Sequence, residues 1–200
     1  MADLVKTILA KPIQLADQVI KLADEACGKR IGIVGFGNIG SRVATRLEAM
    51  GCIVSYTSRN KKHSTNFTFY PNILQLAFNS DAFIICCSLT NDTRHMINST
   101  VMKALGKIGV IINVARGAII NEMELVKCLI EGEIGGAGLD VFENEPNVPN
   151  ELLKLDNVVL LPHRTAFTRE SFHEAAKILL GNLEAFFTNK PLVTPVANGF

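Results

Sequence analysis

Residues Ile31-Gly32-Ile33-Val34-Gly35-Phe36-Gly37-Asn38-Ile39-Gly40 begin as a short apolar run and end in a Gly-x-Gly-x-x-Gly turn, and residues 41–50 then follow a helical pattern. In such a turn Gly35 permits the tight passage from strand to helix, and Gly37 lets the backbone approach a pyrophosphate. Gly40 lets the helix pack closely on the strand, and the free N–H groups at the helix start bind the anion. A strand on one side and a helix on the other favour a dinucleotide-binding turn over a merely structural glycine turn.

The rest of the chain repeats this alternation of strands and helices. Apolar runs indicate strands at 30–34, 52–56, 81–87, 108–114, 134–141 and 157–161, and helical patterns cover 38–50, 72–79, 98–106, 121–131 and 168–188. Asn98 and Thr168 are placed to cap two of these helices, and Asn121 with Glu124 is typical of a capping box. Strands that alternate with helices predict an α/β fold with a doubly wound parallel sheet (Rossmann).

Composition narrows the function classes. Hydrophobic residues make up 48% of the 200 residues, which is enough for a sizeable core, and the formal net charge is only +1. A balance so close to neutral gives no electrostatic reason to expect nucleic acid or an acidic membrane surface as a partner.

The cysteines favour a reducing compartment. The five are odd in number and lack Cys-x-x-Cys spacing; they stand at positions 27, 52, 86, 87 and 128. This pattern argues against a disulfide framework and against a zinc or other metal site, and we interpret the thiols as small buried hydrophobes. Cys86 and Cys87 fall inside an expected strand, where neighbouring side chains point to opposite faces.

No secretory or membrane segment is expected. Charged residues such as Asp3 and Lys6 interrupt the first segment, and no apolar run reaches the ~20 residues of a membrane span. The sequence therefore predicts a cytoplasmic protein without a membrane partner.

The segment after the second expected strand bears on the cofactor. NAD-binding folds place an Asp or Glu about 20 residues past the glycines to bind the ribose 2′-OH. Here the segment reads Ser58-Arg59-Asn60-Lys61-Lys62, without an acid. Arg59 could pair with a 2′-phosphate through a charge-assisted hydrogen bond, and Ser58 could donate another. The alternative is a basic, solvated loop; we predict NADPH in preference to NADH.

Three further stretches go beyond a generic nucleotide fold. They are Asn113-Val114-Ala115-Arg116-Gly117, Gly138-Leu139-Asp140-Val141-Phe142-Glu143-Asn144-Glu145-Pro146 and Pro162-His163. With the glycine turn they closely resemble the D-isomer-specific 2-hydroxyacid dehydrogenases. More narrowly, Asn38-Ile39-Gly40-Ser41, Cys86-Cys87-Ser88-Leu89-Thr90 and Gly135-Gly136-Ala137-Gly138 resemble the plant hydroxypyruvate/glyoxylate and hydroxyphenylpyruvate reductases.

The resemblance implies an NADPH-dependent reductase of small 2-oxo acids whose catalytic residues are Arg116, Glu145 and His163. In this reading His163 donates the proton, Glu145 orients the imidazole and favours its charged form, and Arg116 binds and polarises the substrate. The implied cofactor-binding residues are Gly35, Phe36, Gly37, Asn38, Ile39, Gly40, Ser58, Arg59, Asn60, Val114 and Asp140, with Asp140 on the nicotinamide carboxamide. Taken singly, the three catalytic candidates could instead be a structural histidine, a loop acid and a surface charge.

The same resemblance predicts the domain organisation. The family has a second, substrate-binding domain, built mostly from residues that precede the nucleotide fold, and this chain is expected to lack most of it. We expect residues 1–27 to be a remnant of the interdomain helix, 28–190 the NAD(P)-binding domain and 191–200 a C-terminal tail. Apolar surface left uncovered would favour a homodimer. Two other hypotheses stay open: a catalytically silent nucleotide-binding or dimerisation module, and a regulatory binding protein on the same scaffold.

Overall fold

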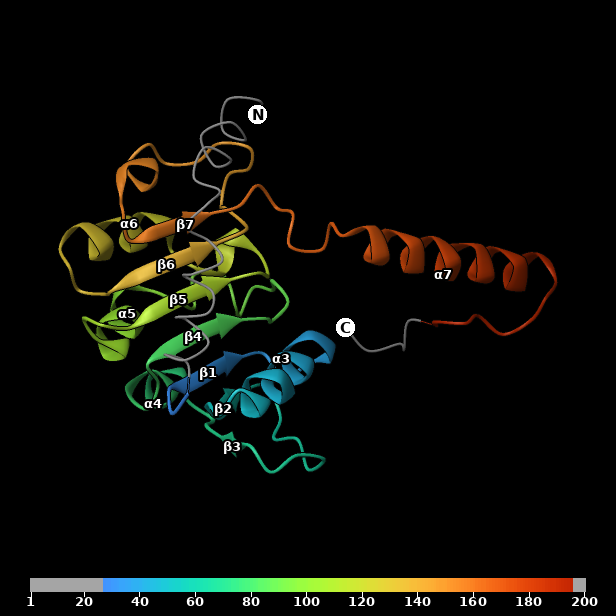
Figure 1. Ribbon diagram of the computed structural model, residues 1–200, viewed down its shortest axis with the longest axis horizontal. Helices are drawn as coiled ribbons and strands as arrows, with labels where there is room; N and C mark the ends of the chain where they lie inside the picture. Colours follow the sequence, from blue (N-terminus) through green and yellow to red (C-terminus); the bar gives the residue numbers. More distant parts are fainter. Residues whose placement is uncertain (1–26, 196–200) are drawn as a thin grey trace. The chain divides into compact units, whose positions relative to one another are not determined.

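The computed structural model describes residues 27–195, and its centre is a seven-stranded sheet (Figure 1). The strands follow the order β3-β2-β1-β4-β5-β6-β7, and every neighbouring pair is parallel. Their bounds are β1 Arg30–Val34, β2 Ile53–Thr57, β3 Thr68–Phe69, β4 Ala82–Ile85, β5 Val110–Asn113, β6 Gly136–Leu139 and β7 Val158–Leu160. The predicted α/β fold with a doubly wound parallel sheet is confirmed.

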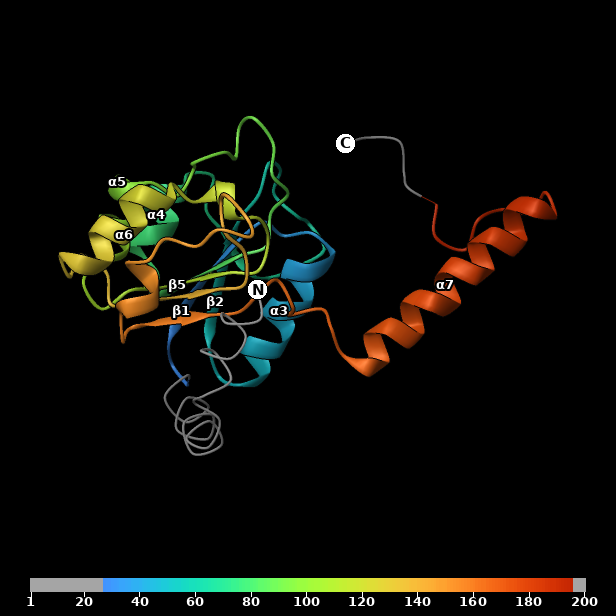
Figure 2. The ribbon, with the colours of Figure 1, turned by 90° about the horizontal axis from the view of Figure 1, so that it is seen from above.

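Helices cover the sheet on both faces. They are α3 Asn38–Ala49, α4 Ile73–Phe78, α5 Ser99–Leu105 and α6 Glu122–Ile130. The described residues also include α7 Arg169–Phe187 and the short 3₁₀ turns η1 Gly117–Ile119 and η2 Leu152–Lys154. Figure 2 shows α4, α5 and α6 on one face and α3 on the other. The larger core lies under α4–α6 and includes Leu76, Met102 and Leu125, whereas the smaller core under α3 includes Ala44 and Tyr56.

The chain changes direction across the sheet at β1. Strand β1 pairs with β2 on one side and with β4 on the other. The helices that follow β1 and β4, namely α3 and α5, therefore lie on opposite faces, which makes the carboxyl ends of these two strands the topological switch point of the sheet. Ligands of open α/β sheets bind at such a point, and the glycine turn follows β1 directly.

The predicted helix caps are present, with one difference. Asn98 Oδ1 accepts from the Val101 amide, and Thr168 Oγ1 accepts from the Ser171 amide. Asn121 Oδ1 accepts from the Glu124 amide at 3.3 Å, as a capping box requires. The Glu124 carboxylate, however, accepts from the Ser99 amide at the start of α5. Only half of the predicted capping box is therefore formed, because the Glu124 carboxylate binds an amide at the start of α5 and not the amide of Asn121.

Strand β1 has its predicted bounds and β2 is shifted by one residue, whereas β4 to β7 are shorter than the apolar runs that predicted them. One strand was not predicted. Strand β3 has only two residues, which pair with Ser55 and Tyr56 of β2. Strand β4 ends at Ile85, so the prediction that Cys86 and Cys87 occupy strand positions is wrong. Burial raises the pKa of both thiols to about 11.

The other thiols differ in exposure. Cys52 and Cys128 are buried, as the interpretation as small hydrophobes requires, but Cys27 is exposed. That interpretation is wrong for Cys27, which stands in the turn before β1.

Residues 164–200 form a second compact unit, described as far as residue 195. Within it the chain folds back on α7, because Asn182 exchanges hydrogen bonds with the amide and hydroxyl of Thr194. An apolar stripe of α7, which includes Phe172, Leu179 and Phe186, is exposed. None of the helices in residues 27–195 is both long enough and apolar enough to cross a membrane.

Candidate active site

Backbone hydrogen bonds extend the sheet past the ends of β5, β6 and β7. The Asp140 amide donates to the Asn113 carbonyl at 3.1 Å, and the His163 amide donates to the Asp140 carbonyl at 2.8 Å. The residues that follow these three strands therefore meet at one edge of the sheet. Among them are Asp140, which is buried, and His163, whose side chain is half exposed.

Glu145 and His163 form a hydrogen-bonded pair at this edge. The Nδ1 atom of His163 lies 2.9 Å from Oε2 of Glu145, and the other carboxylate oxygen accepts from the Phe142 amide at 3.1 Å. Burial raises the pKa of Glu145, but the hydrogen bonds from His163 and Phe142 and the charge of His163 outweigh it, so the pKa lies below its usual value. An ionised carboxylate only accepts, so Nδ1 carries a proton and Nε2 is left for another group.

The backbone of His163 is strained. Its φ angle is +53°, in the left-handed region that a non-glycine residue occupies at a cost of about 1 kcal/mol or more. The hydrogen bond from its amide to Asp140 holds this conformation. The ring is thus fixed from two sides, by the backbone and by Glu145.

Arg116 follows β5, and the strand's last residue holds it. Asn113 is fully buried; its Oδ1 accepts from the Ala115 amide and its Nδ2 donates to the Arg116 carbonyl, both at 3.0 Å. The Arg116 guanidinium donates to the Ala115 carbonyl at 2.6 Å. Within residues 27–195 it forms no hydrogen bond with Glu145 or His163, so the structure brings two of the three catalytic candidates into contact and places the third after the neighbouring strand.

The glycine turn has the geometry that its spacing predicts. Gly35 has φ +97°, and a Cβ added to it would lie 2.5 Å from the Cys87 backbone nitrogen. A Cβ added to Gly40 would overlap the Gly35 carbonyl oxygen, whereas one added to Gly37 would meet nothing within 4 Å. The first helical bond runs from the Ser41 amide to Gly37, so the amides of residues 38–40 precede the intrahelical ladder. This open, exposed helix start fits a pyrophosphate.

The remaining cofactor candidates are placed around the same edge. The Ser58 hydroxyl donates to the Asn60 carbonyl at 2.7 Å, which folds the loop after β2, while Arg59 and Asn60 are exposed. Val114 is half-buried after β5, Phe36 packs against Tyr56 in the smaller core, and Ile39 is exposed on the first turn of α3. No group of three metal-ligating side chains occurs in the described part of the chain.

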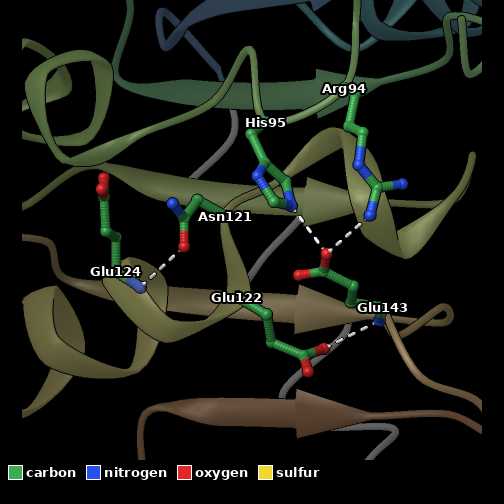
Figure 3. A network of polar contacts seen from close by, with 6 residues as sticks. All are labelled: Arg94, His95, Asn121, Glu122, Glu124 and Glu143. Carbon is green, nitrogen blue, oxygen red and sulfur yellow. Dashed lines mark hydrogen bonds and ion pairs between the residues drawn. The ribbon is translucent and has the colours of Figure 1, made fainter. Parts of the chain in front are cut away.

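A polar network beside the site was not predicted from the sequence (Figure 3). The Glu143 carboxylate contacts His95 Nε2 at 2.7 Å and Arg94 Nη2 at 3.3 Å, and the Glu143 amide donates to Glu122 Oε2 at 3.0 Å. Glu143 lies within the stretch 138–146 that carries the family resemblance, but no function was predicted for it from the sequence. Arg94 and His95 lie 49 and 48 residues earlier, and no local pattern marks them.

Replacing Glu122 with glutamine is expected to change how stability depends on pH. Burial and the nearby Glu143 raise the pKa of Glu122, against the hydrogen bond from the Glu143 amide. A raised pKa means that folding favours the protonated form of Glu122. The contribution of this residue to the free energy of unfolding is therefore full below its unfolded-state pKa and is lost as the pH rises through its folded-state pKa. Glu122→Gln keeps an acceptor for Glu143, and its free energy of unfolding should exceed that of the wild type at pH 7.

Urea denaturation at a series of pH values measures this effect. The advantage of Glu122→Gln should shrink as the pH falls and wild-type Glu122 becomes protonated. Exposed Glu151 provides the control, since Glu151→Gln changes the same charge without a burial effect. A difference between wild type and Glu122→Gln that does not vary with pH would contradict this account.

Comparisons with known proteins identify a family and several similar proteins. A family model described as "D-isomer specific 2-hydroxyacid dehydrogenase, NAD binding domain" matches residues 12–165. A glyoxylate/hydroxypyruvate reductase of Arabidopsis thaliana is 57% identical over 176 residues, which are 88% of this chain and 54% of that protein. A hydroxyphenylpyruvate reductase of Plectranthus scutellarioides is 53% identical over 176 residues, which are 88% of this chain and 56% of that protein.

A solved structure shows the same similarity in three dimensions. The NADPH-dependent glyoxylate/hydroxypyruvate reductase of Sinorhizobium meliloti, in complex with NADP and malonate, superposes with a TM-score of 0.81 at 41% identity. The match covers 85% of this chain and 53% of that one. The chain thus spans about half the length of the relatives it matches. On its sequence, its sheet and its glycine turn, it belongs to the D-isomer specific 2-hydroxyacid dehydrogenases and contains their NAD-binding domain.

Proposed function

We propose that this chain takes part in the NADPH-dependent reduction of a small 2-oxo acid, such as hydroxypyruvate, glyoxylate or hydroxyphenylpyruvate, to the 2-hydroxy acid. The observation that carries the proposal is the 2.9 Å contact between His163 Nδ1 and Glu145 Oε2 at the carboxyl edge of the sheet. It leaves Nε2 of the imidazole to face a reacting group. The names of the relatives supply the substrate class.

Each catalytic candidate has a distinct task in this reaction. When bound, the reduced nicotinamide supplies the hydride that the carbonyl carbon accepts. His163 gives the proton to the carbonyl oxygen from Nε2, and Glu145 stabilises the imidazolium and holds the ring. Arg116 binds the substrate carboxylate and polarises the carbonyl, a task that suits the planar fork of a guanidinium.

The nucleotide would lie along the first strands. Backbone amides from Gly35 to Gly40 would hold the pyrophosphate at the start of α3. Ser58, Arg59 and Asn60 would bind the 2′-phosphate. Val114 and Asp140, after β5 and β6, would contact the nicotinamide end, with Asp140 on the carboxamide.

Replacing Arg59 with alanine is expected to weaken NADPH binding by about tenfold or more, because a charge-assisted hydrogen bond contributes roughly 1.5–3 kcal/mol. NADH lacks the 2′-phosphate, so its dissociation constant should not change. Titration of both cofactors by nicotinamide fluorescence measures the two constants. Lys61→Ala removes a neighbouring exposed charge and serves as the matched control. Equal losses for NADPH and NADH would contradict a 2′-phosphate contact.

The proposed function is tested by NADPH consumption when hydroxypyruvate is added to the purified chain. Parallel assays with glyoxylate and hydroxyphenylpyruvate rank the substrates. Turnover would support the reductase, whereas NADPH binding without turnover would make the chain a silent nucleotide-binding module. A chain that binds neither cofactor would overturn both readings.

We also propose a cytoplasmic homodimer whose residues 28–190 act as the NAD(P)-binding domain. Free thiols support a reducing compartment, and the exposed apolar residues of α7 support burial against another surface. The part assigned to an interdomain helix, residues 1–27, lies outside the described residues apart from Cys27, and so do positions 196–200 of the predicted tail.

A further inference from the structure

Three loops at the carboxyl edge of the sheet are joined at His95, through its backbone amide and its side chain. Arg94 and His95 lie in the loop after β4, η1 follows β5, and Glu143 lies in the loop after β6. The His95 amide donates to the Ala118 carbonyl of η1 at 2.9 Å, while its ring contacts the Glu143 carboxylate at 2.7 Å. Figure 3 shows His95 and Arg94 directed at the same carboxylate oxygen of Glu143.

Glu143 is held at both its backbone and its side chain. Its amide donates to the buried Glu122 at the start of α6, and its carboxylate contacts His95 and Arg94. Only 16% of the Glu143 side chain is exposed. A Cβ added at Gly117 would overlap the Phe142 carbonyl group and the Glu143 amide, so the loop also packs directly on η1. Glu143 has little freedom to move.

This fixed residue stands next to the proposed catalytic groups. One residue separates Glu143 from Glu145, whose carboxylate accepts from Phe142 on the other side of Glu143. The segment that His95 holds through Ala118 begins with Arg116, because Arg116 is the N-cap of η1 and its carbonyl accepts from the Ile119 amide. His95 therefore contacts both the segment that carries Arg116 and the segment that carries Glu145.

We propose that Glu143 and His95 are positioning residues, which set the Glu145–His163 pair relative to Arg116. The inference rests on the proposed function for its catalytic consequence. Neither residue needs to touch substrate or cofactor. Their contact fixes the loop that presents Glu145, and Glu145 in turn fixes the His163 ring. Small displacements of such groups lower rates strongly, since about 1 Å can cost about a hundredfold.

The test compares Glu143→Ala and Glu143→Gln in the full chain. Glutamine keeps an oxygen that accepts from His95 and Arg94, and alanine removes it. The first readout is the ¹⁵N resonance of His163 Nδ1 without substrate, with Glu145→Gln as the reference for a disturbed pair. The second is kcat and KM for hydroxypyruvate. Asp81→Ala is the matched control, because Asp81 pairs with Arg30 at 2.6 Å at the opposite, amino-terminal edge of the sheet.

Glu143→Ala is expected to move the His163 Nδ1 resonance toward that of Glu145→Gln and to lower kcat by about tenfold or more. Glu143→Gln should keep the His163 Nδ1 resonance near its wild-type position and should retain most of the wild-type kcat. Asp81→Ala should lower the unfolding temperature and leave both readouts at their wild-type values. If Glu143→Ala does not fold, His95→Ala removes the same contact from the other side and replaces it in each comparison.

The outcomes separate this inference from the proposed function. A resonance that stays at its wild-type position in folded Glu143→Ala or His95→Ala would overturn the positioning role, whatever the turnover. A wild-type chain without turnover would count against the reductase, while a shifted resonance in the same variants would still support the positioning of His163.

Discussion

Replacing His163 with alanine is expected to lower kcat for hydroxypyruvate by about a thousandfold, within the roughly 10²–10⁴ that a positioned general acid contributes. Without the imidazole, the developing alkoxide must take its proton from water. NADPH affinity should stay at the wild-type value, because the proposed phosphate contacts lie after β1 and β2. Stopped-flow or steady-state absorbance of NADPH gives kcat, and fluorescence titration gives the dissociation constant.

The matched variant for this prediction is Glu145→Gln. It keeps an oxygen near Nδ1 but removes the charge that stabilises the imidazolium, so its loss of kcat should be smaller than that of His163→Ala. Because the pKa of Glu145 is lowered in the folded chain, its carboxylate persists to lower pH than an ordinary glutamate. The pair is thus lost only as the pH falls through that lowered pKa. Nearly wild-type turnover in His163→Ala would show that another group supplies the proton.

Replacing Gly117 with alanine is expected to lower the free energy of unfolding by about 3 kcal/mol, the upper part of the range for overpacked sites. The added Cβ would overlap the Phe142 carbonyl group and the Glu143 amide. These are backbone atoms, which cannot rotate away as the end of a side chain can. The loop that carries Glu145 must therefore move, and kcat should fall together with stability. Urea denaturation measures the loss in the free energy of unfolding.

Gly138 provides the control for this substitution. It lies in the adjacent β6, and a Cβ added there would meet Ile112 Cγ1 at 3.7 Å, an ordinary packing distance. Gly138→Ala should therefore leave the free energy of unfolding within about 1 kcal/mol of the wild type. If Gly117→Ala were equally well tolerated, the close approach of η1 to the loop after β6 would not limit what position 117 accepts.

Most of the fold could be predicted from the sequence because the strongest signals in the sequence are local. The glycine turn needs only six residues in order, and the geometry at Gly35 and Gly40 agrees with the spacing. The caps at Asn98 and Thr168 bond amides three residues away, so they too can be recognised without the tertiary structure. The contact between Glu145 and His163 was predicted differently, through a family resemblance, since the two residues lie 18 positions apart in the sequence.

The features that could not be predicted from the sequence depend on contacts between distant segments. Strand β3 is two residues long and exists because it pairs with β2, so no run of apolar residues marks it. Glu124 has the spacing of a capping-box acid, yet the amide of Ser99, 25 residues earlier, takes its carboxylate. The pairing of His95 with Glu143 is of the same kind, because only the neighbouring positions of β4, β5 and β6 bring those loops together.

The hydrogen bonds that continue past β6 and β7 affect motion at the site. The amide protons of Asp140 and His163 belong to the ladder of the sheet, although the side chain of His163 is half exposed. Exchange of such protons with solvent requires the strands to separate, which is a rare opening of the core and not a fluctuation of a loop. The backbone under His163 therefore moves on the slow timescale of sheet opening, whereas exposed side chains at the same edge reorient within nanoseconds. The ring that Glu145 holds therefore rests on a backbone that opens far more slowly than exposed side chains at the same edge reorient.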